Sequence, residues 1–356
     1  MQTEGIKYAG SKLKLLPHII DMVKGLGAGT VLDGFSGTTR VSQAFAQLGW
    51  AVTSNDIAVW SEVFATCYLK APRPDSFYAP LIAELNALDG KEGWFTANYG
   101  GADDEAKKPF RRANAMKIDA IRERIEDFGL SRTDKSVLLA SLMLAMDSVD
   151  STLGHYASYL KDWSSRSAKP LVLALPRRFK TDCSRHAVCR GDIFDCISGR
   201  EFDLAYFDPP YGSNNTKMPA SRIRYSAYYH IWKSVVLNDK PALFGKARRR
   251  EDSRDRASAS VFEDFRSGAD GRSLAASAID ALIERTAARY ILLSYSSGGR
   301  ATCDEIMDAV ASHGRLVEAR SIDYRTHVMS LMKMTCDWAR DTAGHKEYLF
   351  LMEKGG

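Results

Sequence analysis

The sequence lacks the cysteine patterns that would hold a zinc ion or staple a small fold with disulfides. It contains six cysteines, with no pair separated by two residues and no neighbouring histidine pattern. Such pairs are typical of structural zinc sites, and regular cysteine frameworks are typical of small secreted domains. We therefore expect reduced, mostly buried thiols in a cytoplasmic protein. The six residues are Cys67, Cys183, Cys189, Cys196, Cys303 and Cys336.

The sequence also lacks any apolar run near the roughly 20 residues that a membrane-spanning helix requires. Its start, MQTEGIKYAG, has no apolar segment behind a basic one, so no signal peptide is predicted. We therefore expect no membrane partner. The composition, 45% hydrophobic and 26% charged, is that of an ordinary globular protein.

A strong excess of one charge is missing too. The 49 Lys and Arg residues only slightly outnumber the 44 Asp and Glu residues, giving a net charge of +5. This balance alone is weak evidence for a polyanionic partner. Basic residues nevertheless gather in clusters that can supply phosphate contacts, although each cluster alone is best explained as a solvated face. The clusters are Lys107, Lys108, Arg111 and Arg112, then Arg177, Arg178, Lys180 and Arg185, then Arg248, Arg249, Arg250, Arg254 and Arg256.

Short apolar runs typical of buried strands recur along the chain, with helical patterns between them. The first helical pattern, at residues 40–48, places Val41, Ala44 and Phe45 on one face. Strands that alternate with helices predict a parallel α/β sheet with helices on both faces. The expected strands lie at residues 31–33, 51–54, 187–189, 202–207, 290–294, 316–319 and 348–351.

Two long excursions interrupt this alternation. Residues 58–186 are largely helical by pattern, so we expect an inserted helical domain between the two parts of a catalytic domain, 1–57 and 187–356. The second excursion spans about 212–273 and becomes rich in Arg, Asp and Ser. Its middle, residues 246–259, has little that could pack, which predicts a mobile basic loop when no partner is bound.

The most informative segment is DPPY, directly after one of the expected strands. A ligand crevice in an open α/β sheet lies at the carboxyl ends of its strands, so chemistry is expected here. The amino nitrogen of adenine is a poor nucleophile because its lone pair is delocalised into the ring, and Asp208 with the carbonyl of Pro209 can accept its two protons and direct that lone pair outward. Pro209 and Pro210 stiffen the turn, and Tyr211 offers a ring for an extruded base. The alternative is a plain turn after a strand.

A second candidate site lies at residues 32–39, LDGFSGTT, at the first strand-to-helix turn. Small residues there let the backbone approach a ligand, and the following helix offers free N–H groups. Asp56 ends the second expected strand, where a carboxylate suits hydrogen bonds to a ribose diol. The segment is not the GxGxxG dinucleotide fingerprint, so it predicts a nucleoside site without a pyrophosphate, with a plain nucleotide-binding domain as the alternative.

These segments, in this order, resemble the Dam-like family of adenine-specific DNA methyltransferases. The opening lysine–aromatic–glycine–lysine motif of that family matches residues 7–12 (KYAGSK), and the DPPY motif matches in full. Thr39 stands where family members often carry a second glycine, which leaves the conformation of the loop there open. Further segments similar to the family's motifs are residues 33–39, 55–56, 191–192, 228–232 and 292–295.

The resemblance implies a Rossmann-like sheet of seven strands, mostly parallel with an antiparallel C-terminal strand. It implies S-adenosylmethionine as cofactor, no metal, and methyl transfer to the N6 amino group of an adenine flipped out of a specific duplex DNA sequence. Asp208 and Tyr211 would hold the target base, beside Pro209 and Pro210. Cofactor contacts are implied for Tyr8, Lys12, Asp33, Phe35, Gly37, Thr38, Asp56, Asp192 and Asp208.

The DNA interface is less sharply predicted. The helical region 58–186 stands where the family has its target-recognition region. We also expect phosphate contacts from Lys7, Arg248, Arg249 and Arg250. The biological setting stays open between restriction–modification with a separate cognate endonuclease, a phage and a regulatory system.

Other functions remain as alternatives. A methyltransferase for the amino group of cytosine more often carries SPPY, and one for protein glutamine typically has Asn in place of Asp208. An RNA methyltransferase could use similar chemistry. A DNA-binding protein of the same fold that has lost catalysis is disfavoured by intact Lys12, Asp56 and Tyr211. No clustered carboxylates and lysine support a fused nuclease.

Overall fold

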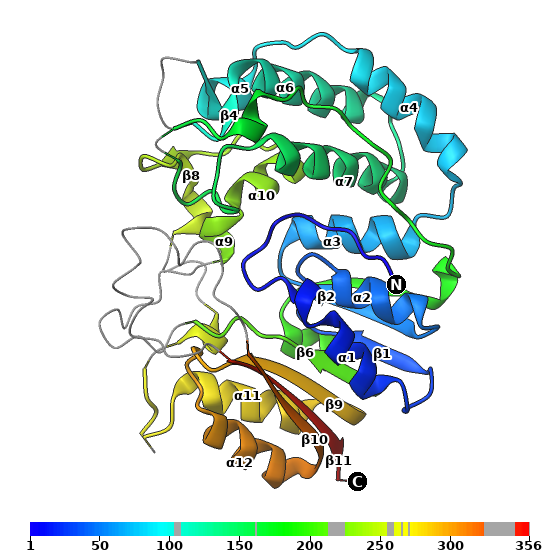
Figure 1. The fold of residues 1–356 in the computed structure, drawn as a ribbon, viewed down its shortest axis with the longest axis vertical. Coiled ribbons are helices and arrows are strands. Elements are labelled where there is room, and N and C mark those ends of the chain that lie inside the picture. Colours follow the sequence, from blue (N-terminus) through cyan, green and yellow to red (C-terminus); the bar gives the residue numbers. More distant parts are fainter. Residues whose placement is uncertain are drawn as a thin grey trace.

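The computed structural model shows a seven-stranded sheet with a helical unit beside it (Figure 1). It describes residues 1–102, 108–160, 162–212, 225–254, 260–264, 266–269, 271–323 and 346–355. The strands, in spatial order, are β10 (Gly314–Asp323), β11 (Lys346–Lys354), β9 (Ala287–Ser296), β6 (Glu201–Phe207), β1 (Thr30–Asp33), β2 (Ala51–Asp56) and β5 (Ala187–Arg190). Neighbouring strands are parallel except where β11 lies antiparallel to β9 and β10. The predicted fold class and all seven expected strands are confirmed.

Helices cover both faces of the sheet, as the alternating pattern predicted. Successive residues of a strand point to opposite faces, and β6 illustrates this because Leu204 and Tyr206 pack on one side while Ala205 and Phe207 pack on the other. The first side is covered by α1 (Leu16–Val23) and α2 (Arg40–Gln47), and the second by α8 (Ile193–Ile197), α11 (Leu274–Arg285) and α12 (Cys303–His313).

The helical unit has its own apolar core. Its helices confirm the largely helical pattern of residues 58–186, and Ser131 caps one of the two longest by accepting a hydrogen bond from the backbone N–H of Asp134. The unit comprises α3 (Val59–Ala65), α4 (Asp75–Ala87), α5 (Trp94–Tyr99), α6 (Arg112–Asp127) and α7 (Arg132–Val149), with the short strands β3 (Gly100–Gly101) and β4 (Phe110–Arg111). The helix α10 (His230–Leu237) also packs into this core through Ile231, Trp232 and Val235, although it lies outside the predicted boundaries 58–186.

The second excursion contains helices and paired strands in its described part, including residues 249–250, while its mobility stays a prediction. After α9 (Tyr225–Tyr228) and α10, the strands β7 (Leu243–Phe244) and β8 (Arg249–Arg250) pair antiparallel. Tyr99 and Tyr159 of the helical unit donate hydrogen bonds to the backbone carbonyls of Arg248 and Ala247. Local composition hid these contacts, because Tyr99 and Tyr159 are distant in the sequence.

Some predicted features lie outside the described residues, among them Lys107, Arg256 and Cys336. The five described cysteines are free thiols, with Cys67 and Cys196 buried. No described helix is long and apolar enough to cross a membrane.

Candidate active site

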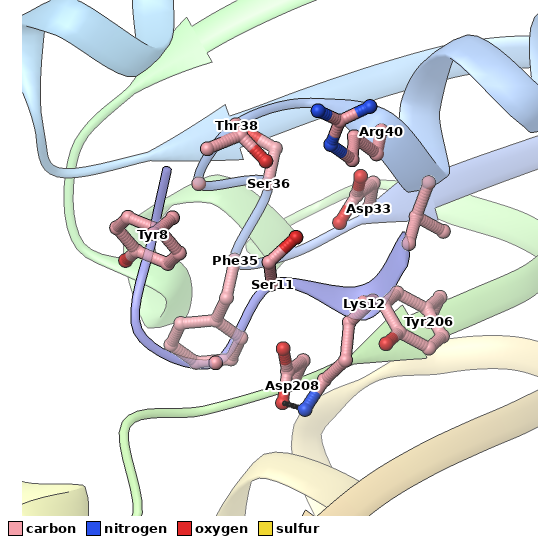
Figure 2. Close-up of a pocket in the computed structure, with 13 residues that line it drawn as sticks. Tyr8, Ser11, Lys12, Asp33, Phe35, Ser36, Thr38, Arg40, Tyr206 and Asp208 are labelled. Atoms are coloured by element: carbon pink, nitrogen blue, oxygen red, sulfur yellow. Dashed lines mark ion pairs between the residues drawn. The ribbon is translucent and has the colours of Figure 1, made fainter. Parts of the chain in front are cut away.

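Seven of the predicted cofactor and catalytic residues line one pocket at the carboxyl ends of β1 and β6 (Figure 2). Parallel strands bring these ends to one edge of the sheet, so loops far apart in the sequence become neighbours. Figure 2 shows Lys12 and Asp208 meeting on one side of the pocket and Tyr8 on another. The predicted residues that line it are Tyr8, Lys12, Asp33, Phe35, Gly37, Thr38 and Asp208.

An ion pair joins the N-terminal motif to the DPPY segment. The ammonium of Lys12 lies 2.9 Å from Oδ1 of Asp208, and both side chains are largely buried. Burial raises the pKa of Asp208 to about 6, against the opposing effect of Lys12. Burial lowers the pKa of Lys12, but the neighbouring carboxylates outweigh it and raise that pKa above its usual value. Asp208 is therefore an ionised acceptor at neutral pH with a cation held beside it.

Asp33 is fully buried at the end of β1. Its Oδ2 accepts a hydrogen bond from the hydroxyl of Ser42 over 2.6 Å, while its buried Oδ1 has no hydrogen-bond partner among the described residues. Burial raises the pKa of Asp33 to about 7. An acceptor without a partner, beside a pocket, is suited to a cationic group of a ligand.

Asp56, at the end of β2, binds the loop between β1 and α2, residues 34–39, directly. Its carboxylate accepts hydrogen bonds of 2.8 Å from the backbone N–H groups of Gly37 and Ala58. Asn55 ties the neighbouring loops together, because its amide donates to the carbonyls of Gly34 (3.1 Å) and Gly191 (3.4 Å). Hydrogen bonds thus connect the loops that follow β1, β2 and β5 along one edge of the sheet.

The rim of this edge contains an apolar residue that sequence analysis missed. Ile57 follows Asp56 directly, and 77% of its surface is exposed. Asp192 caps the start of α8 by accepting a hydrogen bond from the N–H of Phe194 over 2.9 Å, with its side chain at the surface. The one sequence feature that marks Ile57 is its place immediately after the acidic strand end.

The first loop is held in an unusual backbone conformation. Gly37 has φ +47°, and a side chain there would meet the ring of Tyr8 at 3.3 Å. Thr39 also has a positive φ, 62°, and is fully buried. Since left-handed backbone favours glycine, the structure explains why a glycine is common at the position of Thr39 in the resembled family.

The N-terminal segment reaches the pocket because α2 anchors it. Arg40 donates hydrogen bonds to the carbonyls of Thr3 (2.7 Å) and Gly5 (2.9 Å). Gln43 binds both the carbonyl and the N–H of Glu4, at 2.8 and 2.9 Å. These contacts position Tyr8 and Lys12, and no sequence motif marked them.

Tyr211 is engaged by residues from several elements. Its hydroxyl donates to Oε1 of Glu347 over 3.3 Å, and its ring lies edge-on to that of Tyr295 with centroids 5.3 Å apart. The ammonium of Lys12 lies 5.4 Å from the ring centroid. Pro209 and Pro210 connect this tyrosine to Asp208 within the same segment.

The residues predicted to contact DNA occupy different environments. The ammonium of Lys7 binds the carbonyl of Asp147 and lies 2.9 Å from the carboxylate of Asp150, so it anchors the N-terminal segment. Arg248 is exposed, whereas Arg249 binds the carbonyl of Ser253. Only 3% of Arg250 is exposed.

Arg250, predicted to contact a phosphate, lies between two carboxylates, and its contact with DNA stays a prediction. Its guanidinium lies 2.7 Å from Asp239 and 3.0 Å from Asp252. A buried arginine with two carboxylate partners stabilises the fold locally and offers no free charge to DNA. Arg248 is the member of the predicted trio whose side chain lies at the surface.

The sequence matches the family described as D12 class N6 adenine-specific DNA methyltransferase over residues 8–262. The chain belongs to this family. The predicted S-adenosylmethionine-dependent, adenine-specific DNA methyltransferase is thereby confirmed, over the alternatives that act on cytosine or protein. No group of three or more His, Cys, Asp or Glu in the described part of this methyltransferase is placed to hold a metal ion.

Several curated methyltransferases are similar to this one. Type II methyltransferase M.NlaIII of Neisseria lactamica is 28% identical over 358 residues, covering 98% of this chain and 99% of the relative. Type II methyltransferase M.FokI of Planomicrobium okeanokoites is 26% identical, covering 98% of this chain and 53% of the relative. Type II methyltransferase M.CviAII of Paramecium bursaria Chlorella virus 1 is 30% identical, covering 65% and 69%. The methyltransferase thus spans the length of M.NlaIII and about half that of M.FokI.

Proposed function

We propose that this enzyme methylates N6 of an adenine rotated out of duplex DNA, with Asp208 and the carbonyl of Pro209 as acceptors for the amino group. The observation that carries this proposal is the largely buried Asp208 at the end of β6, which pairs with Lys12 over 2.9 Å in the same pocket as the cofactor motif. Rotation of the base costs a few kcal/mol. Stacking on Tyr211 would return about 1–3 kcal/mol.

The residues of the pocket and of the neighbouring strand ends fit S-adenosylmethionine. The unpartnered Oδ1 of Asp33 suits the ammonium of the cofactor's amino-acid part, and Asp56 suits its ribose diol. The exposed Ile57 suits one face of its adenine ring, with Asp192 near the ring edge. When bound, the cofactor supplies a methyl group on a cationic sulfur that departs as a neutral thioether.

The protein's own part in the chemistry is orientation and charge. Asp208 and the Pro209 carbonyl draw the amino protons, which favours a tetrahedral nitrogen with its lone pair directed at the methyl carbon. As the carbon–nitrogen bond forms, the nitrogen becomes positively charged, and the Asp208 carboxylate stabilises that charge before a proton is lost. Lys12 fixes the carboxylate at 2.9 Å so that it is oriented before the base arrives.

The test is to incubate the enzyme with methyl-labelled S-adenosylmethionine and duplex DNA, digest to nucleosides and identify the labelled one. Label in N6-methyladenine is expected. Asp208→Asn should lower the rate about 10³-fold or more. Asp203→Asn is the matched control, because Asp203 lies on the same strand but binds Thr30 at its other end. Equal rates for the two variants, or label in cytosine, would refute the assignment.

We further propose that the enzyme is the modification component of a restriction–modification system and that the helical unit reads its target sequence. The relatives named as Type II methyltransferases support this setting. Genomic DNA from bacteria that express the enzyme should carry N6-methyladenine in one short sequence motif. Methylation scattered over unrelated sequences would contradict it.

A further inference from the structure

The antiparallel strand β11 places an acidic residue beside the active site, and no sequence motif predicts this residue. Because β11 runs against the rest of the sheet, its beginning lies where the parallel strands end. Glu347, its second residue, pairs with Ser296 at the end of β9 and with Ile322 near the end of β10. Only 7% of Glu347 is exposed, although it is charged. A buried carboxylate needs partners.

Both partners of Glu347 belong to the catalytic machinery. Its Oε2 lies 3.5 Å from the ammonium of Lys12, and its Oε1 accepts the hydrogen bond of the Tyr211 hydroxyl over 3.3 Å. Lys12 is therefore shared between two carboxylates, that of Asp208 at 2.9 Å and that of Glu347. One residue thus contacts both the cation beside the acceptor and the ring expected to hold the base.

We infer that Glu347 is a positioning residue for methyl transfer, which shares Lys12 with Asp208 and fixes the hydroxyl of Tyr211. This inference rests on the proposed function of Asp208 and Tyr211. A lysine bound by Asp208 alone would compete with the amino protons of adenine for the same oxygens. By drawing Lys12 partly to itself, Glu347 leaves Asp208 a stronger acceptor. The group formed by Lys12, Asp208 and Glu347 then carries a net negative charge, which favours the cationic sulfur of the cofactor.

The charge of Glu347 has a separate, measurable effect on Asp208. It raises the pKa of Asp208, whereas Lys12 lowers it. Removal of that charge should move the acid limb of the kcat/KM profile to lower pH, since the profile reports the free enzyme's essential ionisation. Other groups that interact electrostatically with Asp208 come from several elements: Tyr8, Asp33, Tyr206 and Tyr225.

The experiment compares Glu347→Gln with Glu353→Gln. Glu353 lies near the other end of β11 and likewise accepts from a tyrosine, Tyr290, and pairs with arginines, but away from the pocket. We expect Glu347→Gln to lower kcat about 10- to 100-fold while KM for DNA changes little. The acid limb of the variant's kcat/KM profile should move to lower pH by about half a pH unit or more. Glu353→Gln should match the parent enzyme in both respects.

The two proposals can fail separately. If the parent enzyme labels adenine but Glu347→Gln has the kcat or the acid limb of Glu353→Gln, the role of Glu347 is overturned and the proposed function stands. If the parent enzyme does not label adenine, the proposed function fails first. Should Glu347→Gln not fold, Glu347→Asp keeps the charge on a shorter side chain. It should retain the parent acid limb with a lowered kcat, and a shifted limb or an unchanged kcat would overturn the inference.

Discussion

Ser42 satisfies only one of the two carboxylate oxygens of Asp33, through a hydrogen bond of 2.6 Å. The other oxygen is buried without a hydrogen-bond partner among the described residues. A carboxylate kept in this state lowers the stability of the protein whenever it is ionised, because burial favours the neutral acid. Such a cost in stability is expected at a site that binds the cationic group of a ligand.

The pH dependence of stability should reveal this cost. The pKa of Asp33, about 7 in the folded protein, lies above that of an unfolded chain. Its contribution to stability is therefore complete below the unfolded pKa and is lost as pH rises through 7. Asp33→Asn should raise Tm by about 2–6 °C at pH 8 and by little near pH 4. Thermal unfolding at both values checks this, and a gain that does not grow with pH would contradict it.

The left-handed backbone of Thr39 makes a second prediction. A glycine relieves the strain of φ 62°, whereas alanine keeps the strain and loses the contacts of the threonine side chain. Thr39→Gly should therefore be more stable than Thr39→Ala by about 1 kcal/mol. Denaturant unfolding of the pair measures the difference. Greater stability of the alanine variant would show that the loop relaxes out of this conformation.

Arg248 and Arg250 should respond to mutation in different ways. Arg248→Ala should weaken DNA binding and flatten its dependence on salt by about one unit of slope, without loss of stability. Arg250→Ala should lower the free energy of unfolding by about 1–3 kcal/mol, because it leaves Asp239 and Asp252 without their shared cation. Anisotropy titrations across a salt series and unfolding curves separate the two effects. An unchanged salt slope for Arg248→Ala would remove it from the interface.

The sequence analysis succeeded where local sequence decides position. Asp33, Asp56 and Asp208 each stand at or just after the end of a strand, so the strand pattern alone placed them at one edge. The environment of Arg250 depends instead on Asp239 and on the packing of α10 into a distant core, which no window of sequence contains. The role of Glu347 depends on the direction of β11 within the sheet.

The position of β11 between β9 and β10 also bears on how the enzyme is made. During synthesis β9 and β10 emerge first, yet neither pairs with the other in the finished sheet. Strand β10 has no neighbour in the sheet until β11 has left the ribosome. Lys12 and Tyr211 lack their contacts with Glu347 until that moment. A nascent chain that already carries the DPPY segment therefore cannot hold Lys12 between two carboxylates, and we expect methyl transfer to reach its full rate only after this strand joins the sheet.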